Sequence, residues 1–372
     1  MPSTSATPAP AYAGIPAAAQ VTALQQVREY PAVSLLLSTT PAAVLTRADA
    51  LRLDALAASA VDRLDDELQP EAALPAIRRL HRLVEQARRG PAAHGLAVYA
   101  SASAESLIRL PIAVRDRAVV DPTFATRDLV RALHRTPRHL VLAFNAGHAR
   151  LFDAAADTML PALTSAFPMY RASRTPGRGR GRADRPTRAA DAADFYRQVD
   201  AALGAYLRLH PAPLVLVGDE RATSAFQRVS VNCGRLAGTV RGNLTATGAT
   251  ELAGRIRATI DAYLHRREHE ALALLDKRFS AGRVATGMPA AWLAARTGRP
   301  EMLIVDETLF YPARLSDDGD TLIPADDIEH PDVIDDAVDE LIELVLTRGG
   351  WIAFTRPGIL EQHQGVALST RP

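Results

Sequence analysis

An α/β fold is predicted for this chain of 372 residues from two observations. Short apolar runs, such as residues 32–39, 140–144 and 214–218, have the length of buried strands. Longer stretches with apolar residues three to four apart, such as residues 46–69 and 75–89, have the period of amphipathic helices. Helices that alternate with short strands are typical of layered α/β domains, and no internal repeat is present.

The composition is that of an ordinary globular protein, with 48% hydrophobic and 23% charged residues. It excludes a disordered chain, a collagen-like fibre and a disulfide scaffold. Aromatic residues make up only 5%, so we expect cores of Ala, Leu, Val and Ile. At roughly 150 residues per domain, the length predicts two to three domains. The single cysteine, Cys233, excludes an intrachain disulfide and a site with several cysteine ligands.

The first predicted domain covers residues 21–135 and follows a tail rich in Ala and Pro, residues 1–20. The tail predicts disorder and has neither the basic start nor the apolar run of a signal peptide. Thr46 is a good N-cap for a long helix, and Pro75 is typical of the start of the next one, which Gly90 ends. The other expected elements are a short helix and three strands: residues 21–30, 32–39, 95–101 and 106–111.

The second predicted domain covers residues 137–268 and opens with a hairpin, because Asn145 to Gly147 suits a tight turn between two apolar runs. The remaining elements are helices near residues 191–210, 222–229 and 249–279, and strands at residues 214–218 and 236–240. The third predicted domain covers residues 280–372. Its helices and short strands alternate, which predicts a three-layer sandwich. The expected elements are a helix at 290–297, a strand at 301–305, a loop or weak hairpin, a helix at 334–346 and strands at 350–354 and 365–369.

The formal net charge of +1 hides a strong local asymmetry. Residues 301–346 hold fifteen acids and one base, Arg314, which predicts an acidic third domain. Residues 171–188 hold seven arginines and one acid, Asp184. This segment also contains three glycines, and none of its residues after 171 is apolar and larger than Ala, so we expect an exposed loop.

The arginine- and glycine-rich segment is the strongest functional signal in the sequence. Guanidinium groups match phosphate oxygens and stack on bases, and glycines let the backbone approach a ligand closely. We therefore predict RNA binding by Arg171, Arg174, Gly177, Arg178, Gly179, Arg180, Gly181, Arg182, Arg185 and Arg188. A docking arm for an acidic protein and a solvated linker are the alternatives.

Other motifs favour structural interpretations. The string from His265 to His269 matches the H-x-x-E-H pattern of zinc peptidases, but its charged surroundings favour a solvated helix face. Cys233 is expected to be a buried small residue, and the acidic run 317–327 a solvated loop. Lys277 is the only lysine and follows no glycine, which argues against P-loop NTPases and protein kinases. The longest apolar runs fall far short of a membrane span of ~20 residues, so we expect a soluble, cytoplasmic protein. We also expect that the protein binds no metal and no cofactor.

The order of these elements resembles the archaeo-eukaryotic class-1 release factor and Pelota superfamily, in the bacterial branch that includes the hibernation factor Balon. The resemblance covers residues 137–372: the hairpin HLVLAFNAGHARLF, the arginine- and glycine-rich segment, the connector helix and the final unit ending in GVAL. It implies a ribonuclease-H-like middle domain. It also implies a third domain with an α/β/α sandwich similar to the kink-turn-binding ribosomal proteins.

The resemblance further implies a protein that enters the ribosomal A site, where the middle-domain loop reaches toward the peptidyl-transferase centre. In release factors this loop carries Gly-Gly-Gln, whose glutamine helps to place the hydrolytic water. Here residues 177–182 read Gly-Arg-Gly-Arg-Gly-Arg, and residues 171–188 contain no glutamine. We therefore expect a factor that occupies the ribosome in hibernation or rescue without cleaving the ester.

The expected partners are ribosomal RNA and tRNA, with an elongation-type GTPase or a basic ribosomal protein as candidates for the acidic domain. Two other classes of function stay open. One is an enzyme, either an RNA hydrolase of the middle domain or a metal hydrolase that uses His265 and His269. The other is a stress-linked adaptor that binds proteins through its acidic domain.

Overall fold

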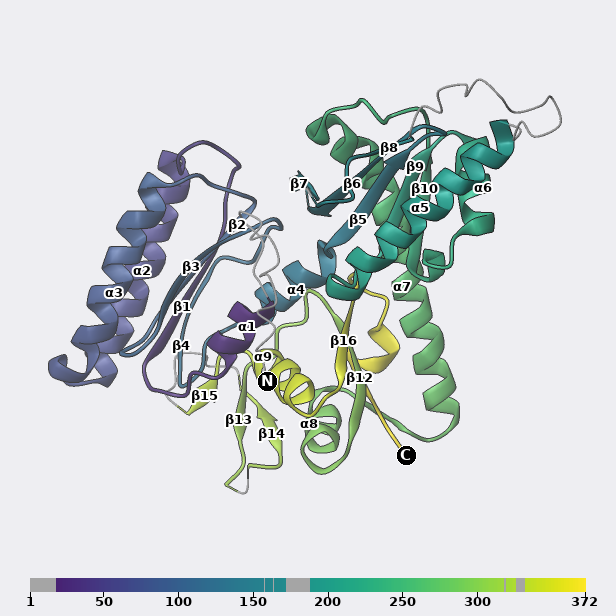
Figure 1. Cartoon of the computed structure of the whole chain (residues 1–372). Helices are drawn as coiled ribbons and strands as arrows, with labels where there is room; N and C mark the ends of the chain where they lie inside the picture. The colour runs from purple at the N-terminus through teal and green to yellow at the C-terminus, as the bar shows by residue number, and fades with distance from the viewer. Residues whose placement is uncertain (1–17, 157, 163, 172–187, 318, 326–331) are drawn as a thin grey trace, which may run out of the picture. The chain divides into compact units, whose positions relative to one another are not determined.

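The structure is a computed structural model that describes residues 18–156, 158–162, 164–171, 188–317, 319–325 and 332–372. The chain forms two compact units: one is Pro137–Arg266, and the other combines the described parts of Ala13–Thr136 and Arg267–Pro372. Helices and strands alternate throughout, as expected of an α/β protein (Figure 1). Each of the three predicted domains has a main sheet of its own. The exact boundaries of the domains remain predictions.

The first sheet is antiparallel, with the strand order β3-β2-β1-β4. Its strands are β1 (Ala32–Ser38), β2 (Gly95–Ala100), β3 (Glu105–Leu110) and β4 (Arg117–Asp121). Helices α2 (Arg47–Glu67) and α3 (Pro70–Arg89) cover one face, where Leu35, Leu53 and Leu80 share a core (Figure 1). Helices α1 (Ala18–Gln25) and α4 (Arg127–Arg135) pack on the opposite face, with Leu36 and Leu129 in their core.

The helix boundaries of this part follow local chemistry. Thr46 caps α2 as predicted, since its hydroxyl accepts the Asp49 N–H at 3.1 Å. The prediction that the next helix starts near Pro75 is wrong: α3 begins at Pro70, and Pro75 lies inside it. Pro70 occupies the first turn, where the missing N–H costs no helical hydrogen bond. Strand β4 and helix α4 were not predicted from the sequence.

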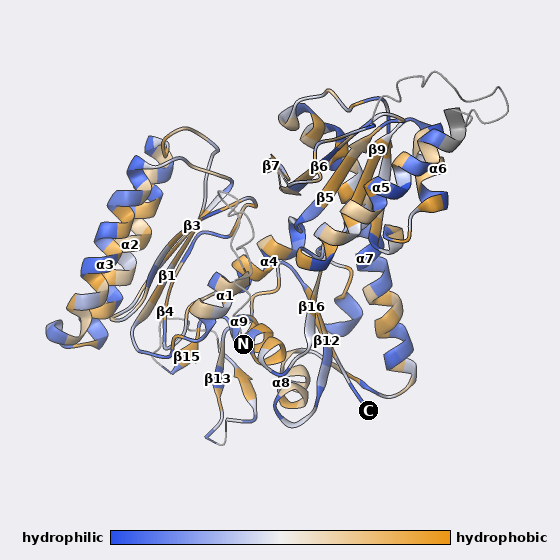
Figure 2. Ribbon diagram, in the orientation of Figure 1, coloured by the Kyte–Doolittle hydropathy of each residue, from blue (hydrophilic) through white to orange (hydrophobic). Residues whose placement is uncertain are grey.

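The second sheet is mixed, with the order β10-β9-β5-β6-β7 and β8 paired to β6. Its strands are β5 (His139–Phe144), β6 (His148–Ala155), β7 (Thr158–Pro161), β8 (Met169–Tyr170), β9 (Leu214–Gly218) and β10 (Leu236–Arg241). Strands β5 and β6 form the predicted hairpin. Helices α5 (Arg188–Leu209) and α6 (Glu220–Val229) cover one face, and α7 (Ala249–Ser280) covers the other. In Figure 2, β5 and β9 are hydrophobic between these layers.

The third main sheet has the order β11-β17-β12-β16. Its strands are β11 (Val284–Thr286), β12 (Pro300–Asp306), β16 (Trp351–Thr355) and β17 (Val366–Thr370). Helices α8 (Met288–Thr297) and α9 (Ala337–Thr347) cover one face, and the end of α7 covers the other, which gives the predicted three layers. A small sheet joins β13 (Ala313–Leu315), β14 (Leu322–Pro324) and β15 (Val333–Ile334) where the sequence indicated a loop or weak hairpin.

Several acids of residues 301–346 are buried in ion pairs rather than solvated. Arg117 of β4 lies 2.9 Å from Asp336 and 3.2 Å from Asp339, and Arg127 lies 2.7 Å from Asp336. Arg63 of α2 lies 3.2 Å from Asp335. This cluster joins the first sheet and its helices to α9, so part of the acidic charge serves an intramolecular interface. Within the described residues, no helix is long and apolar enough to span a membrane.

Candidate nucleic-acid interface

The structure fixes the two points between which the arginine- and glycine-rich segment runs. The segment leaves the sheet after β8, where the N–H of Arg171 donates to the carbonyl of Gly147 at 2.9 Å. It returns at Arg188, the first residue of α5. The side chain of Arg171 is exposed. The other predicted RNA-binding residues before Arg188 lie outside the described residues: Arg174, Gly177, Arg178, Gly179, Arg180, Gly181, Arg182 and Arg185.

The turn beside this exit point is held by side chains. The Asn145 carboxamide oxygen accepts the N–H groups of Gly147 and His148, both at 2.9 Å, and its amide donates to Thr245 at 3.2 Å. Arg150 donates to the carbonyl oxygens of Thr245 and Thr247, each at 3.0 Å. These contacts tie the β5–β6 turn to the loop after β10. The exit point therefore lies on a braced support.

A cavity of about 580 Å³ lies between this exit point, α5 and α6. Small apolar residues line it together with Tyr196 and three arginines, Arg171, Arg221 and Arg228. Asp219, the one acid among the described lining residues, caps α6 by accepting the Ala222 N–H at 2.7 Å. Burial raises the pKa of Tyr196, so its hydroxyl stays protonated. The lining suits an anionic ligand such as a phosphodiester.

Residues 138–299 match the family model described as bacterial archaeo-eukaryotic release factor family 3. This segment is therefore similar to the bacterial archaeo-eukaryotic release factors. It contains the hairpin, the arginine- and glycine-rich segment and the cavity, and extends through α7 and α8. We call residues 138–299 the release-factor segment. No curated protein matches the chain.

The solved structures that match this chain include Pelota from Archaeoglobus fulgidus, at 15% identity and a TM-score of 0.36 over 95% of this chain and 91% of that one. Dom34 from S. cerevisiae, described as a translation termination-like factor that interacts with Hbs1, has 11% identity and a TM-score of 0.43 over 76% and 73%. A ribosome-bound archaeal Pelota with ABCE1 has 12% identity and a TM-score of 0.42 over 97% and 95%. All three TM-scores lie below 0.5.

Buried acids of the release-factor segment have structural partners. Asp153 pairs with Arg138 and accepts the Tyr206 hydroxyl at 3.1 Å, and burial raises the pKa of Tyr206 to about 12. Asp200 accepts the Val231 N–H at 3.1 Å. Among the described residues, no group of three His, Cys, Asp or Glu side chains is arranged to hold a metal ion.

The other two candidate motifs are also structural. Glu268 of the H-x-x-E-H string is buried and accepts the Arg356 N–H at 3.0 Å, while His265 and His269 are exposed. Burial raises the pKa of the Cys233 thiol, which opposes formation of a reactive thiolate. The exposure of His265 and His269 agrees with the predicted solvated helix face, but the burial of Glu268 does not. Cys233 is half-buried, whereas the sequence predicted a buried residue.

Two arginines of the cavity were missed in the sequence analysis. Arg221 and Arg228 are seven residues apart on α6, which places them two turns apart on one helix face. That spacing was a usable signal. The sequence gives no signal that these two arginines share a cavity with Arg171, because that depends on the packing of α5 and α6 against the sheet.

Proposed function

We propose that this protein is a ribosome-binding translation factor that occupies the A site in the cytoplasm, in hibernation or rescue, without cleaving peptidyl-tRNA. One observation carries the proposal. The segment that matches the release-factor family model contains seven arginines from Arg171, directly after β8, to Arg188, the first residue of α5. It has neither the Gly-Gly pair nor the glutamine of a hydrolytic loop.

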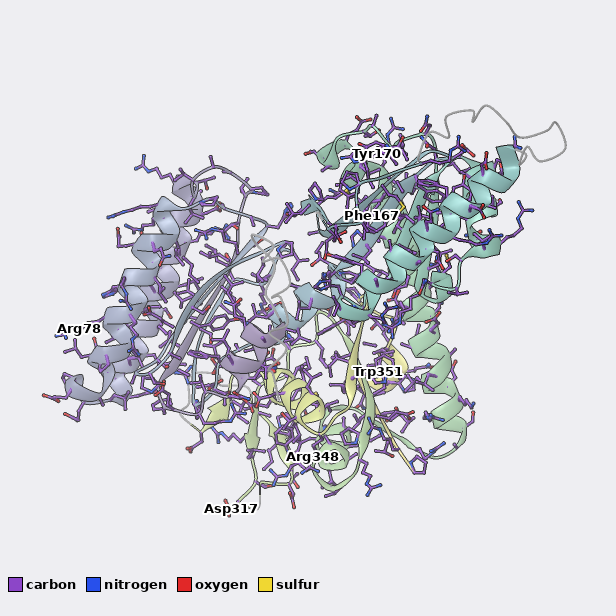
Figure 3. The ribbon with its side chains drawn as sticks, viewed as in Figure 1. Arg78, Phe167, Tyr170, Asp317, Arg348 and Trp351 are labelled. Atoms are coloured by element: carbon purple, nitrogen blue, oxygen red, sulfur yellow. The ribbon has the colours of Figure 1, made fainter. Side chains whose placement is uncertain are left out.

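The charges around this segment support RNA as the partner. Arg171, Arg221 and Arg228 line one cavity beside the point where the segment leaves the sheet. Among the described residues that line this cavity, the one acid is Asp219, which already caps α6. Arginines in this density are suited to the phosphates of ribosomal RNA or of a tRNA acceptor end. As a second partner we propose a basic ribosomal protein or an elongation-type GTPase. It would face acids that stay exposed, such as Asp317 (Figure 3).

The test is co-sedimentation of the protein with vacant bacterial 70S ribosomes over a range of salt concentrations. The variant changes Arg178, Arg180 and Arg182 to Ala, and the control changes the same residues to Lys, which keeps the charge. If all three arginines contact phosphates, the slope of log affinity against log salt falls by about two to three in the Ala variant, at ~0.7–0.9 per contact. The Lys variant retains most of the slope.

Failure of the wild-type protein to pellet at any salt concentration would overturn the proposal. Pelleting that is unchanged in the Ala variant would remove the arginine-rich segment from the interface and favour a contact through the acidic residues.

A further inference from the structure

An exposed aromatic side chain lies one residue before the arginine- and glycine-rich segment. Tyr170 ends β8 and is 67% exposed. Its ring is parallel to that of His148, with ring centroids 4.4 Å apart and planes at 6°. Figure 3 shows Tyr170 with Phe167, which is buried in the core from the same stretch of chain. The sequence analysis did not identify either ring of this pair.

The support under the tyrosine is fixed by the backbone and by side chains. His148 and Tyr170 are direct cross-strand partners of β6 and β8. The N–H of His148 donates to Asn145, and the next residue after Tyr170 donates to Gly147. The orientation of the Tyr170 ring is therefore set before any ligand arrives.

The imidazole ring of His148 is neutral near pH 7. Burial, with a further contribution from Arg150, lowers the pKa of His148. The Nε2 atom of His148 is buried and has no hydrogen-bond partner among the residues that the structure describes. His148 is thus an uncharged ring that stacks against one face of Tyr170. The rest of the Tyr170 side chain is exposed to solvent.

We propose that Tyr170 is a stacking platform for an unpaired nucleobase of RNA. The choice of RNA rests on the proposed function. An exposed aromatic ring binds bases of any sequence, and cationic neighbours hold the adjoining phosphates. Arg171 follows Tyr170 directly and lines the cavity that also contains Arg221 and Arg228. One short stretch of chain therefore supplies both a ring for a base and a guanidinium for a phosphate. A proline-rich peptide could also stack on a tyrosine, but it would not use these arginines.

The first experiment compares the ribosome affinity of Tyr170→Leu with that of Tyr170→Phe. Leucine keeps apolar bulk but removes the ring, whereas phenylalanine keeps the ring and removes only the hydroxyl. Loss of one stacked base lowers affinity about 5- to 150-fold, which corresponds to ~1–3 kcal/mol. We expect this loss in the Leu variant at every salt concentration with an unchanged salt slope, and an affinity near that of wild type in the Phe variant.

The second experiment uses Tyr170→Trp as a fluorescent reporter and needs no ribosome. The wild-type protein, which contains only Trp292 and Trp351, supplies the background signal. We expect a short single-stranded oligoadenylate to quench the new tryptophan, and an abasic ribose-phosphate oligomer of equal length to leave it unchanged. Quenching by a proline-rich peptide but not by oligoadenylate would assign the platform to a protein ligand and overturn the proposal.

The two proposals fail in different ways. If wild-type protein pellets with ribosomes but the Leu variant binds equally well and the reporter is not quenched, the platform is wrong and the proposed function stands. If wild-type protein does not pellet, the proposed function is wrong. The oligoadenylate experiment then decides by itself whether Tyr170 binds bases.

Discussion

The buried ion-pair cluster around Arg117 gives a sharp prediction about stability. The side chain of Arg117 is 9% exposed and lies within 3.4 Å of three carboxylates, those of Asp128, Asp336 and Asp339. The substitution Arg117→Met keeps much of the volume but leaves these buried charges without the guanidinium. Removing one partner of a buried ion pair typically costs ~3–5 kcal/mol, because the remaining charge stays buried without compensation.

The neighbours of Arg117 place the expected loss at the lower end of that range. Asp336 keeps Arg127 at 2.7 Å, and Asp128 keeps Arg131 at 3.0 Å. Asp339, whose side chain is 10% exposed, loses its ion pair with Arg117 at 3.2 Å. We therefore expect Arg117→Met to lower the free energy of unfolding of this unit by about 3 kcal/mol.

Urea unfolding followed by circular dichroism measures this loss. The control is Arg78→Met, which changes an exposed arginine of α3 (Figure 3) and is expected to shift stability by less than ~0.5 kcal/mol. The double variant Arg117→Met/Asp339→Asn removes one uncompensated charge and should recover ~1 kcal/mol or more relative to the single variant. A loss below ~1 kcal/mol in Arg117→Met, or no recovery in the double variant, would refute this reasoning.

Two further predictions concern pH and the core beneath the cavity. Burial raises the pKa of Asp339 from 3.8 to about 6. Between these two values the folded protein holds a proton on Asp339 that the unfolded chain releases. This proton's contribution to stability is complete below pH ~4 and is lost as the pH rises through 6. In Asp339→Asn the stability measured between pH 4 and 6.5 should therefore fall less with rising pH than in the wild-type protein, and parallel curves would contradict the assignment. Phe226 is fully buried against Phe144, with ring centroids 4.9 Å apart, so Phe226→Ala should cost ~3–5 kcal/mol in thermal unfolding. A cost below ~1 kcal/mol would mean that α6 does not pack on this core.

Local signals in the sequence were sufficient for elements that depend on a few neighbouring residues. Asn145 and Gly147 identified the hairpin turn because the side chain of Asn145 accepts hydrogen bonds from its own turn. Thr46 identified the start of α2 for the same kind of reason. The apolar run 214–218 matched β9 because that strand is buried between α5 and α7 and all of its residues are enclosed.

The sequence could not identify features that depend on distant parts of the chain. Strand β4 is short and only partly buried, and it is defined by its pairing with β1, more than eighty residues earlier. The sequence indicated Asp336 and Asp339 only as part of an acidic third domain, because their partner, Arg117, is remote in sequence. The same holds for the site: composition alone indicated the arginine-rich segment, whereas the Tyr170 and His148 stack required the register of β6 and β8.

One measurement tests the central claim most directly: ribosomes that carry formyl-methionyl-tRNA in the P site are mixed with the protein, and both pelleting and release of formyl-methionine are followed. The account predicts one protein bound per ribosome and release at the rate of ribosomes alone, because residues 171–188 contain no glutamine to place a hydrolytic water. Release above that rate would contradict the non-catalytic role, and absence of binding would contradict the ribosomal function itself.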